Sequence, residues 1–262
     1  MYVSIKTQVN PMENGKNNPI IDLHSHILPQ MDDGSKDVQT SVQMLHRLAE
    51  QGVDTVCATP HFYARQESID RFLCRRMHAF SQLNDTHMDA NDFRWPAIQL
   101  GAEIAYFPGV SECAGLEQLC LTGTRTLLLE LSYTQWTPQQ VEDVASLSLD
   151  HGYQVILAHP ERYAHIKTFQ TDMERLLSLP VALQMDADSL LSWHRRKLAL
   201  QLLESTPFPL LGSDCHDLST RPPRLAQARQ VVARKLGKEM LEKLDETALI
   251  WTQNQTVETW EV

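Results

Sequence analysis

Residues 20–34 read IIDLHSHILPQMDDG, an apolar run that closes on His24 and His26 and is followed by an Asp-Asp-Gly turn. In an extended segment, side chains at positions i and i+2 point to the same face, so these two imidazoles can hold one metal ion. The stretch predicts a buried strand with metal ligands at its C-terminal end. It also predicts a chain turn permitted by Gly34 and a following helix capped by Ser35.

Short apolar runs of the same kind recur along the chain. They are rich in Ile, Leu and Val without strict alternation, which is typical of strands buried on both faces of a parallel sheet. Helical patterns lie between them, and such alternation indicates β-α units. The strand candidates are 19–24, 53–61, 96–106, 125–133, 153–160, 181–187 and 207–214, and the helical segments are 36–51, 66–85, 138–151, 188–205 and 223–252.

Seven β-α units favour an α/β barrel, or a distorted relative of one, over an open sheet. Six of the seven strand candidates end in a side chain that can bind a metal ion. A single such residue is usually a solvated loop residue, but the C-terminal ends of parallel barrel strands converge on one mouth, where active sites lie. In strand order these residues are His24 with His26, His61, Glu103, Glu130, His159, and Asp214 with His216.

The chemistry of this set points to several divalent ions. With Asp33 it contains five imidazoles, four carboxylates and no cysteine, which suits Mn, Fe, Co or Zn. Nine ligands are too many for one ion, so two or three ions that share carboxylates are expected. Three divalent ions would leave the cluster about two units positive, which would attract a phosphate dianion.

The bulk composition excludes several classes of protein. A net charge of −10 is unsuited to nucleic-acid binding, which relies on many Lys and Arg contacts. The five cysteines include no C-x-x-C pair and predict reduced thiols in the cytoplasm. No run approaches 18 apolar residues, so no membrane insertion is expected. Residues 1–18 are polar and predict a flexible N-terminal extension before a single domain over 19–262.

Six motifs together resemble the polymerase-and-histidinol-phosphatase (PHP) superfamily, and within it the CpsB/YwqE-type bacterial protein-tyrosine phosphatases of capsule and exopolysaccharide gene clusters. The motifs are DLHSHILPQMDDGS, ATPHF, GAEI, LLLELSY, LAHPERY and GSDCHD. The resemblance implies a distorted (β/α)7 barrel with a trinuclear site, commonly with manganese, that hydrolyses phosphotyrosine by a metal-bound hydroxide. The implied partner is the tyrosine-rich C-terminal tail of a bacterial tyrosine kinase that regulates capsular or exopolysaccharide synthesis.

The resemblance also implies a role for each residue of the site. Arg162 and Arg221 match the family's phosphate-binding arginines, and Asp186 stands where the family more often has Asn. The first ion would take His24, His26, Glu103 and Asp214; the second would share Glu103 and add Glu130 and His159; the third would take Asp33, His61 and His216.

Three other interpretations compete with this one. Cys215 and Arg221 form a literal C-x5-R, the signature of cysteine-dependent tyrosine phosphatases, although the five residues between them include no glycine. The same metals could also serve a small phosphomonoester such as histidinol phosphate. Finally, the chain could be a metal-binding interaction module that lacks catalysis.

Overall fold

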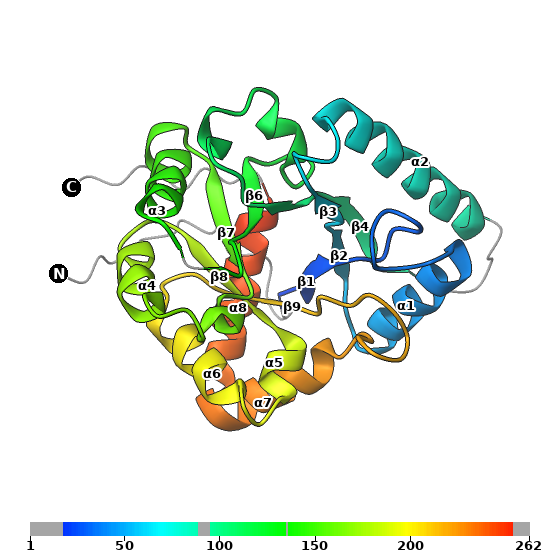
Figure 1. Cartoon of the computed structure of the whole chain (residues 1–262). Coiled ribbons are helices and arrows are strands. Elements are labelled where there is room, and N and C mark those ends of the chain that lie inside the picture. The colour runs from blue at the N-terminus through cyan, green and yellow to red at the C-terminus, as the bar shows by residue number, and fades with distance from the viewer. Residues whose placement is uncertain (1–17, 89–94, 135, 254–262) are drawn as a thin grey trace.

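The computed structural model describes residues 18–88, 95–134 and 136–253. Within these ranges, short parallel strands occupy the middle of the molecule and helices surround them (Figure 1). The prediction of a flexible extension over residues 1–18 falls almost entirely outside the described residues. The single domain over 19–262 stays a prediction.

The strands form two parallel sheets. The first has the order β1-β2-β4, and the second has the order β3-β5-β6-β7-β8-β9. Each of the seven predicted apolar runs contains a strand, and two runs contain two short strands each. The strands are β1 (Ile21–Ser25), β2 (Thr55–Ala58), β3 (His61–Phe62), β4 (Ala97–Leu100), β5 (Glu103–Ala105), β6 (Thr126–Glu130), β7 (Gln154–Ala158), β8 (Ala182–Asp186) and β9 (Pro209–Gly212).

The two sheets meet on both sides and so enclose a ring. On one side, β2 leads into β3 past Pro60, which has no N–H for the ladder, and β4 leads into β5 past Gly101. On the other side, Ser25 pairs in parallel with Cys215 beyond β9, and the His26 N–H donates to the Cys215 carbonyl at 2.9 Å. This ring of seven strand positions is the predicted distorted (β/α)7 barrel.

Helices cover the outside of the ring (Figure 1). They are α1 (Val38–Glu50), α2 (Ile69–Met88), α3 (Pro138–Ala145) with a π-helical turn (Ser146–Asp150), α4 (Phe169–Leu177), α5 (Ala187–Leu191), α6 (Arg196–Ser205) and α7 (Leu225–Leu236). The described loops contain three 3-10 helices: Val110–Glu112, Leu116–Leu119 and Pro160–Tyr163. In the described ranges, no helix is both long and apolar enough to span a membrane.

The last helix, α8 (Lys238–Thr252), closes the N-terminal end of the barrel. In Figure 1 it lies behind the strands at the centre of the molecule. Thr126, at the start of β6, donates to the Trp251 carbonyl at 2.7 Å, and Lys243 donates to the carbonyl of Thr206 before β9 at 3.1 Å. The opposite end, where the strands finish, is the end that carries the predicted ligands.

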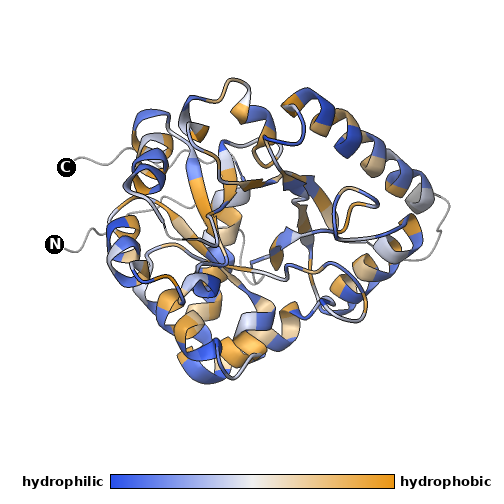
Figure 2. Cartoon of the chain, viewed as in Figure 1, coloured by the Kyte–Doolittle hydropathy of each residue, from blue (hydrophilic) through white to orange (hydrophobic). Residues whose placement is uncertain are grey.

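Apolar side chains on alternate strand positions build two cores. Leu128, Ile156 and Leu210 cluster with Trp251 of α8, whereas neighbours such as Leu127 belong to the larger cluster under the outer helices. Figure 2 shows the apolar residues concentrated on the strands and on one side of the surrounding helices. Burial on both faces explains why the strand sequences do not alternate.

Of the two local predictions about the turn after β1, the cap was wrong, and the need for glycine has a different physical reason from a positive φ. Ser35 does not cap α1; Asp37 does, and its carboxylate accepts from the Thr40 N–H at 2.7 Å. Gly34 has no positive φ, but a Cβ there would lie 2.4 Å from the His26 Cβ. The chain needs glycine at that position because the backbone passes directly against His26.

The segment 223–252, predicted as helical, contains two helices, α7 and α8. They part at Gly237, whose φ of +90° favours glycine. Helix α4 and the 3-10 helices were not predicted at all. The segment 138–151 does begin at Pro138, and Thr137 and Gln140 form a capping box before it.

Candidate metal centre

The structure brings all nine predicted ligands together at the C-terminal ends of the strands. Each one contacts at least one other member of the set through side-chain donor atoms 3.6 Å or less apart. His24 lies in β1, His61 in β3, Glu103 in β5 and Glu130 in β6, whereas His26, Asp33, His159, Asp214 and His216 lie in the loops that follow β1, β7 and β9.

His24 and His26 face two carboxylates at the centre of the cluster. Their Nε2 atoms are 3.1 Å apart, and Glu103 Oε2 lies 3.2 Å from His24 and 3.3 Å from His26. Asp214 Oδ1 lies 3.5 and 3.3 Å from the same two atoms. Both carboxylate oxygens are buried without a hydrogen-bond partner. Buried carboxylate oxygens need a cation or a donor, so this convergence fits a divalent ion.

Glu103 occupies a bridging position. Its Oε1 lies 2.9 Å from His159 Nε2, and its Oε2 lies 2.9 Å from His61 Nδ1. Glu130 Oε1 lies 3.6 Å from the same nitrogen of His159. With His24 and His26, one carboxylate therefore touches four imidazoles, as a ligand shared between two ions would.

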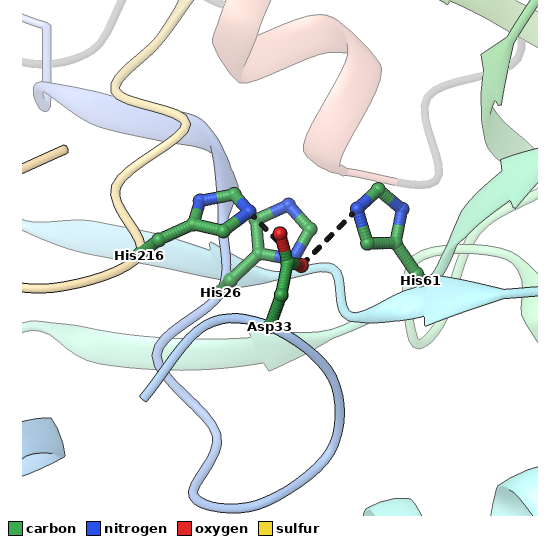
Figure 3. Close-up of side chains that lie close together, drawn as sticks. All are labelled: His26, Asp33, His61 and His216. Carbon is green, nitrogen blue, oxygen red and sulfur yellow. Dashed lines mark ion pairs between the residues drawn. The ribbon is translucent and has the colours of Figure 1, made fainter. Parts of the chain in front are cut away.

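A third group lies toward solvent (Figure 3). Figure 3 shows the imidazoles of His216, His26 and His61 gathered around the carboxylate of Asp33. Asp33 Oδ1 lies 3.4 Å from His216 Nε2 and 3.6 Å from His61 Nε2. His216 Nδ1 contacts the Asp214 carbonyl at 2.9 Å, which leaves the buried Nε2 without a hydrogen-bond partner. Because the Asp33 side chain is 66% exposed, this edge of the cluster is open to solvent.

Electrostatics mark the cluster as one system of opposed charges. Burial alone would lower the pKa of His24, but neighbouring carboxylates, Glu103 first, raise that pKa to about 9. Burial and the positive charge of Arg162 lower the pKa of His159 to about 4. Burial and the charge of Glu103 raise the pKa of Glu130 to about 7. The carboxylates therefore crowd one another strongly enough that bound cations would relieve their repulsion.

Two of the clustered residues have an unusual backbone. His159 has φ of +32° and Asp214 has φ of +49°, a region that L-residues rarely occupy. Among the described non-glycine residues, only Gln30 shares this feature. Strained backbone at both positions indicates that the surrounding fold forces these side chains into the mouth.

Sequence reasoning missed two residues that orient the histidines. Gln184 of β8 contacts His24 Nδ1 through its Oε1 at 2.9 Å, and Asp32 Oδ2 contacts His26 Nδ1 at 2.7 Å. Partners of this kind fix the ring and leave the other nitrogen free for a metal. The Asp-Asp pair in the opening stretch was a usable signal for Asp32. Nothing local marks Gln184, because its role depends on the order β8, β9, β1 in the barrel, in which its side chain reaches His24 past Gly212.

Both predicted arginines reach the mouth. Arg162 lies in the 3-10 helix after β7 and contacts Asp214, and its Nη2 lies 2.5 Å from Asp186 Oδ2. Arg221 Nη2 lies 2.5 Å from Asp214 Oδ2, and its side chain is 34% exposed. Two guanidinium groups therefore converge beside the metal-type cluster, where an oxyanion could exchange for the carboxylate contacts.

A cavity of about 450 Å³ opens above the cluster. Its walls include both arginines and six of the nine clustered residues, with three tyrosines and Ala105 on the remaining side. The cavity joins the metal-type side chains and the arginines in a single space large enough for a phosphoryl group and part of its leaving group.

The thiol of Cys215 is outside this space. Its side chain is fully buried, and burial raises its pKa above the ordinary value for a thiol. A nucleophilic cysteine needs access and a lowered pKa. The geometry therefore opposes the cysteine-phosphatase interpretation of the C-x5-R spacing, although Arg221 itself does face the site.

Comparisons with known proteins find relatives over most of the chain. The family model described as "Capsular polysaccharide synthesis, CpsB/CapC" matches residues 20–248. The tyrosine-protein phosphatase YwqE of Bacillus subtilis is 29% identical over 246 residues, which cover 91% of this chain and 93% of YwqE. The tyrosine-protein phosphatase CpsB of Streptococcus agalactiae serotype III is 28% identical, with 86% of this chain and 94% of CpsB covered.

Solved structures give the same result. A crystal structure from the pair YwqE of Bacillus subtilis and CpsB of Streptococcus pneumoniae, described as metal-dependent tyrosine phosphatases, matches with a TM-score of 0.79. That match is 28% identical and covers 90% of this chain and 96% of the other. A histidinol phosphate phosphatase of Lactococcus lactis, complexed with zinc, matches with a TM-score of 0.52 at 16% identity and shows the shared fold alone.

Proposed function

The chain belongs to the CpsB/CapC family of capsular polysaccharide synthesis, and on that premise we propose that it is a metal-dependent protein-tyrosine phosphatase, a phosphoric monoester hydrolase. One observation carries the proposal: buried carboxylate oxygens without hydrogen-bond partners converge on imidazoles directly beside two arginines. Cations would pair with the buried carboxylates, and a phosphoryl oxyanion would pair with the two arginines.

The donor set fits two or three divalent ions held by the nine clustered side chains. The donors are oxygen and nitrogen atoms without a thiolate. We propose manganese as the bound ion, with iron, cobalt or zinc as alternatives that the same donors accept. When bound, such ions supply Lewis acidity and lower the pKa of coordinated water toward neutrality. Asp32 and Gln184 would hold the rings of His26 and His24 in the orientation that binding needs.

The two arginines would bind the phosphoryl oxygens. Each guanidinium can donate two parallel hydrogen bonds to a phosphate, and both contact Asp214, which lines the cavity. The same contacts would stabilise the charge that spreads over the phosphoryl oxygens in the transition state. A phenolate leaving group, whose conjugate acid has a pKa of about 10, needs little help from a general acid.

The substrate in this proposal is a phosphotyrosine in a flexible segment. The tyrosine-rich tail of a bacterial tyrosine kinase in capsular or exopolysaccharide synthesis is the proposed partner, and the cytoplasm is the proposed compartment. The exposed edge of the cluster at Asp33 would let an extended tail reach the metals without a deep tunnel.

The test is hydrolysis of a phosphotyrosyl peptide by the full chain treated with EDTA, then with Mn²⁺ restored, beside the Cys215→Ser variant. Loss with EDTA, recovery with Mn²⁺ and an active variant are expected, because the buried thiol takes no part. Activity that ignores EDTA but vanishes in Cys215→Ser would overturn the proposal. Histidinol phosphate serves as the parallel substrate, and faster turnover of it would move the substrate assignment to small phosphomonoesters. A metal-loaded chain that hydrolyses neither would be an interaction module.

A further inference from the structure

Tyrosines gather at the cavity of the metal centre. Among the described residues, five large apolar or aromatic side chains are exposed: Tyr63, Met77, Tyr133, Leu149 and Trp193. Two of the five, Tyr63 at 37% exposure and Tyr133 at 47%, line this one cavity. Because both side chains are exposed, core packing alone does not explain their position, and we look for their role in the cavity itself.

The two tyrosines follow strands on either side of β5. Tyr63 comes directly after β3, and its ring centroid lies 5.2 Å from that of His61. Tyr133 follows β6 by three residues, and its ring stacks on His159 at 6.3 Å with an interplanar angle of 24°. Each tyrosine ring therefore contacts the imidazole ring of a predicted metal ligand.

The strand between them ends in a small residue. β3 pairs with β5, and β5 pairs with β6, so the tyrosines belong to strands two positions apart. β5 ends at Ala105, which lines the same cavity. A larger side chain at that position would take up part of the cavity that the two tyrosines line.

The dimensions fit one additional aromatic ring. Strands two positions apart in a sheet are separated by roughly 9.6 Å. A ring held between two others, at the centroid separations of about 4.5–7 Å that aromatic pairs adopt, needs about 9–14 Å in total. The spacing of β3 and β6 is therefore compatible with a planar group between the two tyrosines that follow these strands, which line the same cavity as Ala105.

We propose that Tyr63 and Tyr133 form the walls, and Ala105 the floor, of a slot that holds the aryl ring of the substrate while the arginines hold its phosphoryl group. The proposal rests on the phosphatase function proposed above and names the residues that select aryl over alkyl phosphates. Tyr63, Tyr133, Ala105 and both arginines line the same cavity, so one aryl phosphate can contact the tyrosines and the arginines together. Tyrosine walls also suit the rim of an open mouth, because the phenol ring offers an apolar face beside a polar hydroxyl.

The test uses two competitive inhibitors that differ only in the group the slot would hold. Phenylphosphonate and methylphosphonate both present a phosphonate to the arginines and metals, but only the first carries a ring. Their inhibition constants are measured on the Mn²⁺-supplemented full chain against p-nitrophenyl phosphate. The variants are Tyr63→Leu, Tyr133→Leu, the double variant, the Tyr→Phe pair and Ala105→Leu.

We expect the wild-type chain to prefer phenylphosphonate. Each Leu variant should reduce that preference about 5-fold, and the double variant about 10- to 30-fold, because each removes one aromatic pair. The Tyr→Phe variants should keep the preference for phenylphosphonate, since they retain the aromatic ring. Ala105→Leu should weaken phenylphosphonate alone by filling the floor. Trp193→Leu, an exposed aromatic residue that does not line the cavity, is the matched control and should change neither constant.

The outcomes separate this inference from the proposed function. A wild-type chain without phosphotyrosine turnover would overturn the phosphatase function on which the slot depends. Normal turnover with an unchanged inhibitor ratio in the double variant and in Ala105→Leu would overturn the slot alone. A parallel loss of both inhibitors in the Leu variants would mean that the tyrosines support the metal site and do not select the ring.

Discussion

Asp32 and Asp33 are adjacent carboxylates with opposite surroundings. The Asp33 side chain is 66% exposed and faces His61 and His216, whereas the Asp32 side chain is 5% exposed. Asp32 also accepts from the His61 N–H at 2.8 Å. Burial would raise the Asp32 pKa, but the contact with His26 holds it below its ordinary value. One residue is thus placed to bind a metal and its neighbour to hold a ligand in position.

The variant Asp32→Ala should weaken Mn²⁺ binding about 10- to 100-fold, because His26 loses the partner that fixes its ring. Isothermal titration calorimetry of the metal-free chain measures the change. Asp37→Ala is the control: it removes the cap of α1 and should cost about 1 kcal/mol of stability without altering Mn²⁺ affinity. Equal Mn²⁺ affinities in the two variants would contradict the orienting role.

Asp186 should oppose phosphate binding through Arg162. Its buried carboxylate lies 2.5 Å from the Arg162 guanidinium and places a negative charge near the proposed phosphoryl site. We expect Asp186→Asn to lower KM for a phosphotyrosyl peptide several-fold with little change in kcat, since repulsion falls while an acceptor remains. Asp188→Asn, which changes the partner of Arg224, should leave KM unaltered. A rise in KM for Asp186→Asn would show that the charge is needed to hold Arg162.

At the scale of elements, β9 must pass very close to β1 for the cluster to form. A Cβ on Gly212 would lie 2.6 Å from the His24 Cβ and 2.8 Å from Gln184 Nε2. The Asp214 N–H then donates to the His24 carbonyl at 2.8 Å, which carries Asp214 to the histidines. Glycine in β9 thus permits the contact between strands that are distant in sequence.

We predict that Gly212→Ala displaces His24 and lowers stability by about 1–3 kcal/mol, with weaker Mn²⁺ binding as well. Chemical denaturation and calorimetry measure the two effects. Gly123→Ala is the control. Gly123 has a φ of +81°, and a Cβ there would meet no atom within 4 Å. This variant should therefore lose stability through backbone strain and keep its Mn²⁺ affinity. Unchanged metal affinity in Gly212→Ala would mean that β9 can move away without disturbing the site.

At the scale of the whole molecule, the cluster joins both sheets. β1 belongs to the first sheet, while β3, β5 and β6 belong to the second, and all four contribute clustered side chains. Ions bound there would connect segments from one end of the chain to the other. Folding and metal binding should therefore be linked.

Mn²⁺ should raise the melting temperature of the metal-free chain, and saturating Mn²⁺ at about 1,000 times its Kd should add about 4 kcal/mol per ion. Differential scanning calorimetry at several Mn²⁺ concentrations measures the increase. In Glu103→Gln, most of the increase in melting temperature with Mn²⁺ should disappear, because this carboxylate touches four histidines. A melting temperature that does not depend on Mn²⁺ would exclude tight binding in the folded chain.

Local patterns in the chain predicted the order of the strands, most of the helices between them, and the residues at the ends of the strands. Each apolar run and the polar residue at its end lie within a few consecutive residues, so both are visible in the sequence. His24, His61 and Glu130 could then be assigned to one mouth because the strands of a parallel barrel end on the same side. Helix details were less predictable. Asp37 replaced Ser35 as a cap, and the 223–252 pattern divided at Gly237, because capping depends on backbone angles that composition does not specify.

The contacts that make these residues a site come from tertiary packing. Gln184, Asp32 and the slot tyrosines take their roles from neighbours on other strands, at distances that sequence spacing does not encode. Burial also separated Cys215 from Arg221, which the C-x5-R spacing had placed together. Periodicity and residue type are local properties, whereas orientation, burial and charge coupling arise only when segments far apart in the chain are brought to within a few ångströms.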